Sequence, residues 1–149
     1  MKIPNLQQID TVMGASSSTK HSTIMLLDDN EIDNFVNKKV LQNNNFAERI
    51  YTHTSSRSAL EFLENLNSDD DVTSELIPEI IFVDINMPIM DGLQFLEEFE
   101  RNSEAIADKV KIVMLTTSIN PQDIEKCANN PKIIKYINKP LTKEHLDGI

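Results

Sequence analysis

Short apolar runs alternate with segments of helical spacing along most of the chain. Four runs are rich in Ile, Val, Leu and Met, which is typical of strands buried on both faces of a parallel sheet. A fifth segment, residues 47–54, has a weaker strand pattern. The predicted strands comprise residues 23–27, 47–54, 80–83, 111–115 and 133–137.

Between these strands, apolar residues recur at the spacing of three and four that is typical of amphipathic helices. Asp91 and Gln94 resemble a capping box, which predicts the start of a helix at this position. Asn120 followed by Pro121 is an N-cap signal with proline in the first turn. The predicted helices comprise residues 30–43, residues 55–67, and segments that begin after Asp91, after Asn120 and at Leu141.

The alternation of strands and helices predicts an α/β fold, with a parallel sheet and helices on both of its faces. The chain has 149 residues, which is the usual size of one domain. Residues 1–20 are small and polar near their end, and we expect a disordered N-terminal tail followed by a single domain over residues 21–149. Residues 67–79 carry five acids and no base, which predicts an exposed acidic loop.

The charge and cysteine content narrow the possible functions. Fourteen Lys and Arg against twenty-four Asp and Glu give a net charge of −10, which argues against direct binding of nucleic acid or anionic membranes. No apolar run approaches the roughly 20 residues of a membrane span. Cys127 is the only cysteine, so no internal disulfide can form, as expected of a cytoplasmic protein. The three glycines cannot form a glycine-rich nucleotide-binding loop.

Polar residues follow four of the predicted strands and indicate a common site. They are Asp28 and Asp29, Asp84, Thr116, and Lys139. Ligand sites in open parallel sheets form beyond the carboxyl ends of the strands, so these side chains should converge. Clustered carboxylates select a hard cation such as Mg²⁺, and a hydroxyl with an ammonium group suits phosphoryl oxygens. The set predicts a site that places a phosphoryl group on a carboxylate or removes it.

Four motifs at these strand ends resemble those of the receiver domain of two-component response regulators. They are residues 26–30 (Leu-Leu-Asp-Asp-Asn), 83–92 (with Val-Asp-Ile-Asn-Met-Pro and Met-Asp-Gly), 115–117 (Leu-Thr-Thr) and 136–140 (Tyr-Ile-Asn-Lys-Pro). The resemblance covers about residues 22–149 and implies a doubly wound, flavodoxin-like sheet of five strands in the order 2-1-3-4-5.

The resemblance implies a role for each acidic residue of the site. Asp84 is similar to the aspartate that accepts the phosphoryl group. Asp29 resembles the direct Mg²⁺ ligand, and Asp28 resembles the aspartate that acts mainly through water. The backbone carbonyl of Asn86 resembles the third protein ligand of the Mg²⁺ ion.

The remaining motif residues resemble those that respond to phosphorylation. Thr116 and Lys139 match the residues that bind the phosphoryl oxygens. Tyr136 matches the switch aromatic, which turns inward when the threonine moves. Thr117 departs from the small Ala or Ser that the family often has there, which implies slightly reduced access to the site.

The resemblance implies a stand-alone signalling switch in the cytoplasm. A sensor histidine kinase or a histidine phosphotransfer protein would phosphorylate Asp84 with Mg²⁺, and the chain would catalyse only this step and its own dephosphorylation. The expected readout is contact with a downstream protein target, with homodimerisation on phosphorylation as a further possibility.

Two other functions remain open from the residues alone. A Mg²⁺-dependent phosphatase with an aspartate nucleophile would use similar groups, but it usually has a second Asp two residues after the first, where this chain has Asn86. A degenerate receiver that only binds a partner is the second alternative, and the complete set of site residues argues against it.

Overall fold

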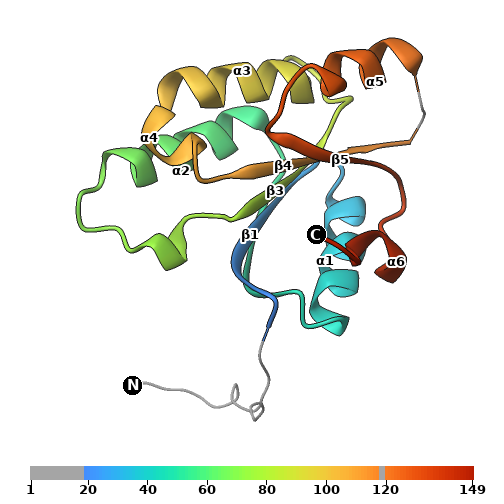
Figure 1. The fold of residues 1–149 in the computed structure, drawn as a ribbon, viewed down its shortest axis with the longest axis horizontal. Helices are drawn as coiled ribbons and strands as arrows, with labels where there is room; N and C mark the ends of the chain where they lie inside the picture. Colours follow the sequence, from blue (N-terminus) through green and yellow to red (C-terminus); the bar gives the residue numbers. More distant parts are fainter. Residues whose placement is uncertain (1–18, 118–119) are drawn as a thin grey trace.

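The computed structural model describes residues 19–117 and 120–149, so nearly all of the predicted tail, residues 1–20, lies outside the described residues. The described chain forms a five-stranded, fully parallel sheet in the order β2-β1-β3-β4-β5 (Figure 1). This confirms the predicted fold class and strand order. The strands are β1 (His21–Leu27), β2 (Ala47–His53), β3 (Ile80–Asp84), β4 (Lys111–Thr116) and β5 (Ile133–Asn138).

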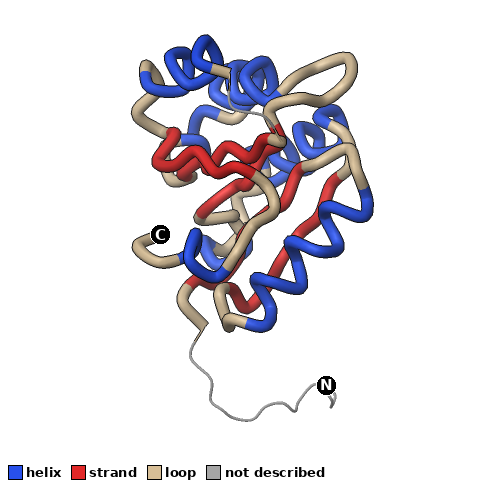
Figure 2. Tube along the Cα trace, turned by 90° about the vertical axis from the view of Figure 1, so that its right-hand side faces the viewer, coloured by secondary structure: helices blue, strands red, loops and turns tan. Residues whose placement is uncertain are grey.

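Helices cover both faces of this sheet (Figures 1 and 2). The helices are α1 (Glu31–Asn43), α2 (Ser56–Ser68), α3 (Gly92–Asn102), α4 (Glu104–Ala107), α5 (Pro121–Ala128) and α6 (Lys143–Leu146). One core cluster joins the sheet to α2, α3, α4 and α5, and a second joins the opposite face to α1 and α6. No helix in residues 19–117 or 120–149 is long and apolar enough to cross a membrane.

Side-chain caps fix where four of the helices begin. The side chains of Asn30, Ser55 and Asn120 accept hydrogen bonds from backbone N–H groups in the first turns of α1, α2 and α5. Asp91 and Gln94 form a full capping box at α3, as the sequence predicted. Three residues separate the end of β1 from the start of α1, and the loop of residues 85–91 separates the end of β3 from the start of α3.

Three local features differ from the sequence prediction. The predicted acidic loop contains a 3₁₀ turn, η2 (Ser74–Leu76), and a separate short helix, α4, follows α3. The last helix begins at Lys143 rather than at Leu141, because Leu141 packs into the core before the helix starts. Helices of four residues or fewer span about one turn and therefore have no periodicity to detect.

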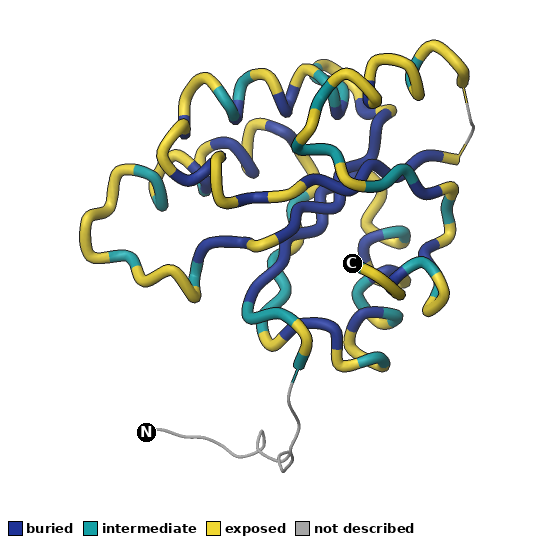
Figure 3. Tube along the Cα trace, viewed as in Figure 1, coloured by how far each residue is buried: buried dark blue, intermediate teal, exposed yellow. Residues whose placement is uncertain are grey.

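The orientation of α1 is unusual for a helix that covers a sheet. Its buried residues are Asn34, Asn37 and Leu41. The apolar residues that give the segment its helical spacing lie largely outside the core, with Ile32 71% exposed and Phe35 62% exposed. Figure 3 shows the contrast between the buried strands and the more exposed helical layers.

Candidate functional site

Three carboxylates meet at the carboxyl edge of the sheet. Asp28, Asp29 and Asp84 each offer an oxygen atom, and these atoms lie within 4.8 Å of one another. Strand β1 ends at Leu27, so the alternation of side chains along a strand no longer separates Asp28 from Asp29. The convergence that the sequence predicted for the acidic residues is therefore present.

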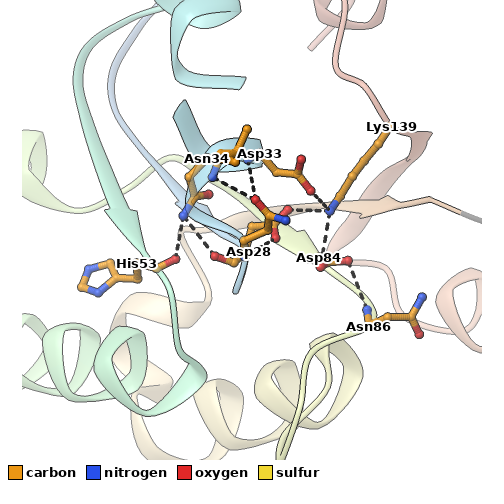
Figure 4. Close-up of polar contacts among 9 residues, drawn as sticks. Asp28, Asp33, Asn34, His53, Asp84, Asn86 and Lys139 are labelled. Carbon is orange, nitrogen blue, oxygen red and sulfur yellow. Dashed lines mark hydrogen bonds and ion pairs between the residues drawn. The ribbon is translucent and has the colours of Figure 1, made fainter. Parts of the chain in front are cut away.

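The ammonium group of Lys139 lies among these carboxylates (Figure 4). Its Nζ atom is 2.5 Å from Oδ2 of Asp28 and 3.4 Å from Oδ2 of Asp84. The side chains of Lys139 and Asp28 are 8% and 1% exposed, so the pair is shielded from solvent. One cation thus pairs with two of the three clustered carboxylates, and the cluster keeps an excess of negative charge.

The two charged groups at the centre of the site have altered pKa values. Burial raises the pKa of Asp84 to about 6, and the negative charge of Asp28 adds to the rise, while Lys139 partly opposes it. Burial alone would lower the pKa of Lys139. Its hydrogen bond to Asp28 and the charge of Asp84 outweigh burial and raise this pKa to about 12. Lys139 is therefore charged at neutral pH.

Backbone and amide hydrogen bonds hold the acidic residues in place. The N–H of Asn30 donates to Oδ1 of Asp28 at 2.9 Å, and the N–H of Asn86 donates to Oδ1 of Asp84 at 3.2 Å. Nδ2 of Asn34 donates to the backbone carbonyls of Asp28 and His53, both at 3.1 Å. Asn34 is buried for this reason, because it ties the ends of β1 and β2 to α1.

Gly92 allows α3 to start close to the end of β3, the strand that carries Asp84. Its N–H donates to the carbonyl of Ile85 at 2.9 Å. A Cβ atom at this position would lie 2.7 Å from the carbonyl oxygen of Asp84 and 3.0 Å from Cα of Ile85. Both contacts are with backbone, which cannot swing aside, so the position requires glycine.

Thr116 is the last residue of β4, and Tyr136 lies on the neighbouring strand β5, two residues before its end. Thr116 is fully buried, and its carbonyl accepts a 2.7 Å hydrogen bond from the N–H of Lys139. The Tyr136 hydroxyl is also buried. Burial raises the pKa of Tyr136, and an interaction with the side chain of Thr116 opposes this rise. The two residues expected to respond to phosphorylation are thus neighbours.

Two residues of this site, Asp33 and Asn34 in α1, were not predicted from the sequence. Oδ2 of Asp33 lies 3.1 Å from Nζ of Lys139. An acid in the first turn of a helix is ordinary, because it interacts favourably with the helix dipole, so Asp33 gave no functional signal. Its distance from Asp29 along the chain gave no signal either, because Asp29 precedes the cap residue Asn30 and lies outside the helix.

Comparison with known proteins assigns the chain to one family. Residues 24–148 match the family model described as the response regulator receiver domain. The chain belongs to this family. The match includes both acidic motifs and Lys139, and receiver domains act in two-component and phosphorelay signalling.

Individual relatives agree with this assignment. A two-component response regulator from Cytophaga hutchinsonii has a solved structure similar to this receiver domain, with 29% identity, a TM-score of 0.76, and coverage of 85% of this chain and 92% of that one. The probable methanogenesis regulatory protein FilR2 of Methanothrix harundinacea is 25% identical over 83% of this chain and 75% of its own. The sensor histidine kinase CheAY of Helicobacter pylori is 27% identical over 95% of this chain, which spans only 17% of the kinase.

The donor atoms of the receiver domain fit the metal that this family typically binds. Its acidic cluster consists of carboxylate oxygens, which Mg²⁺ prefers over nitrogen or sulfur. Asp29 is exposed while Asp28 and Asp84 are buried, so the cluster is open on one side. An open side suits Mg²⁺, because this ion keeps several of its waters.

Proposed function

We propose that this receiver domain accepts a phosphoryl group on Asp84 in a Mg²⁺-dependent reaction and thereby switches a protein–protein contact. The observation that carries the proposal is the placement of the Lys139 ammonium 3.4 Å from Oδ2 of Asp84, which itself belongs to a cluster of three carboxylates. Family membership supports the same role. The donor would be a sensor histidine kinase or a histidine phosphotransfer protein in the cytoplasm.

The transfer forms one bond and breaks one. An oxygen of the Asp84 carboxylate attacks the phosphorus atom of a phosphohistidine. The bond between phosphorus and nitrogen breaks, and its electron pair stays on the donor imidazole. Mg²⁺, when bound, would supply positive charge that offsets the negative charge of the phosphoryl group. The carboxylates of Asp28, Asp29 and Asp84 and the backbone carbonyl of Asn86 would hold this ion.

Lys139 and Thr116 would bind oxygens of the phosphoryl group on Asp84. The ammonium is already within reach of the acceptor, so little movement is needed to pair it with the new charge. Thr116 interacts with Tyr136, and a hydroxyl drawn toward a phosphoryl oxygen would weaken that interaction. The Tyr136 hydroxyl is buried, so a movement of Thr116 would change its polar surroundings and the surface above it.

The surface of α1 supports a protein partner as the donor. Ile32, Phe35 and Val36 are exposed apolar residues, and Asp33 beside them contacts Lys139. Any donor that reaches Asp84 must approach this edge of the sheet. A helix with apolar side chains would bury this patch while it presents its phosphohistidine to the site.

A phosphorylation assay tests the proposal and separates its rivals. The protein is incubated with Mg²⁺ and phosphoramidate, and its intact mass is followed together with the release of inorganic phosphate. We expect one added phosphate, no addition to Asp84→Asn, and normal addition to Asp70→Asn, a matched change at an exposed acid.

Three results would contradict the proposal. Continuous release of phosphate with many turnovers would indicate a phosphatase, and no added phosphate would indicate a module that only binds partners. Addition to Asp84→Asn at the rate of the parent protein would move the acceptor to another residue.

A further inference from the structure

Lys139 has a third carboxylate partner outside the three-carboxylate cluster. Oδ2 of Asp33, in the first turn of α1, lies 3.1 Å from Nζ of Lys139 (Figure 4). The same Nζ atom lies 2.5 Å from Asp28 and 3.4 Å from Asp84. The Asp33 side chain is 38% exposed, whereas Asp28 and Asp84 are almost fully buried. The ammonium is therefore shared between the interior of the site and its rim.

The first turn of α1 holds Asp33 in this position. The backbone N–H of Asp33 donates to Oδ1 of the cap residue Asn30 at 3.1 Å. The next residue, Asn34, is bonded to the carbonyls of Asp28 and His53. The Asp33 backbone is thus bonded to the cap residue, the side chain of the next residue is bonded to Asp28, and the Asp33 carboxylate lies within reach of Lys139.

We propose that Asp33 is a positioning residue that shares the Lys139 ammonium with the acceptor site, so that it favours Mg²⁺ binding and slows phosphorylation. The inference rests on the proposed function, because it assigns a second role within the same site. Asp33 would affect Mg²⁺ and the phosphoryl group through Lys139, without contacting either of them.

The effect on Mg²⁺ follows from the competition between two cations. An ammonium 2.5 Å from Asp28 repels a divalent ion bound at the same carboxylate. Asp33 offers a carboxylate outside the acidic cluster to which the ammonium can move when the ion binds. Without Asp33, the ammonium would remain on Asp28 and Asp84, and Mg²⁺ would bind more weakly.

The effect on phosphorylation has the opposite sign once Mg²⁺ is saturating. A phosphoryl group on Asp84 needs the Lys139 ammonium, and Asp33 competes with it for the same N–H donors. The negative charge of Asp33 also repels an anionic phosphodonor at the rim of the site. Removal of this charge should therefore speed phosphorylation.

The experiment compares Asp33→Asn with Glu31→Gln. Glu31 is an exposed acid in the same helical turn, so its neutralisation matches the loss of charge and of helix-dipole interaction without touching Lys139. Calorimetry measures the Mg²⁺ dissociation constant, and intact mass follows phosphorylation by phosphoramidate at saturating Mg²⁺, at low and at high salt.

We expect Asp33→Asn to weaken Mg²⁺ binding and to speed phosphorylation, each by about two- to fivefold, as suits a half-exposed ion pair. The gain in rate should shrink as salt is added. Glu31→Gln should change both quantities less. Asp33→Ala, which also removes the hydrogen-bond acceptor, should change them at least as much as Asp33→Asn.

Failure of this inference can be told apart from failure of the proposed function. A parent protein that gains no phosphate contradicts the proposed function. A parent that is phosphorylated, with an Asp33→Asn variant that is equally fast or slower, overturns the role of Asp33. Equal shifts in Asp33→Asn and Glu31→Gln would also overturn it, because a general charge effect would then explain the data.

Discussion

The interior of the sheet and its carboxyl edge are built on opposite principles. In the middle of β3, Ile81, Phe82 and Val83 are fully buried between two helical layers. One residue further along, Asp84 is also buried, but it is a carboxylate with other carboxylates beside it. Burial stabilises the first group, whereas for the second it costs free energy that one lysine only partly offsets.

The difference indicates that the middle of each strand provides stability and that the strand ends provide the site. Apolar side chains inside the sheet position the strand ends rigidly, and the strand ends can then hold charges close together. Changes in the interior should therefore lower stability, whereas neutralising a charge at the edge should raise it. Three predictions test this contrast, and they are ordered by the size of the expected effect.

The largest effect should come from Phe82→Ala. Phe82 is fully buried and packs edge-on against Phe46, with the ring centroids 6.0 Å apart. The lost burial and the cavity should reduce the free energy of unfolding by about 3–5 kcal/mol. Urea denaturation measures the loss. Phe35→Ala, at a position 62% exposed, is the matched control and should change stability by no more than about 0.5 kcal/mol.

The next effect concerns metal and the edge carboxylates. Mg²⁺ at a hundredfold excess over its dissociation constant should stabilise the protein by about 2.7 kcal/mol. Asp29→Asn should lose most of this increment, because it removes a ligand. In EDTA the same variant should melt a few degrees higher than the parent, since about 1 kcal/mol shifts a domain of this size by about 2–8 °C.

Thermal melts of both proteins, first in EDTA and then in Mg²⁺, measure the two effects. If Asp29→Asn melts lower in EDTA and keeps the full Mg²⁺ increment, Asp29 has a structural role and the metal binds elsewhere. Asp70→Asn, at an exposed position in the acidic loop, should behave as the parent does.

The smallest effect is the pH dependence of the metal-free protein. The pKa of Asp84 is about 6 in the folded protein, above its ordinary value near 4. The folded state therefore binds this proton more tightly than the unfolded state does. Stability from this group should rise as the pH falls from about 7 through 6 toward 4, by about 1–2 kcal/mol.

Asp84→Asn should lack this rise and should be more stable than the parent at pH 7. Urea denaturation in EDTA across the same range of pH provides the measurement. A parent and a variant with parallel pH profiles would contradict the raised pKa.

The amino-acid sequence was sufficient to predict the sheet and the residues at its edge. Strands such as Ile80–Asp84 are recognisable because they are buried on both faces, and their ends must converge whatever the helices do. This geometric necessity is why the pattern of residues alone could bring Asp28, Asp84 and Lys139 together in one site.

The helical contribution to the site was not predictable in the same way. In α1, Asn34 and Asn37 face inward while Phe35 faces outward, the reverse of the usual amphipathic order. The inward position of Asn34 depends on two carbonyls at the ends of β1 and β2, which are brought together only by the tertiary fold. The contact between Asp33 and Lys139 likewise spans 106 residues of sequence.

The pairing of Asp28 with Lys139 also has a consequence for how the protein is made. The two residues are 111 positions apart, and Lys139 follows the last strand. A growing chain on the ribosome therefore contains the three carboxylates well before it contains their cation. Closing so long a loop is among the slower steps in folding. The complete charged site should accordingly form only when the sheet is complete, and an unfinished chain should hold its three carboxylates without their cation.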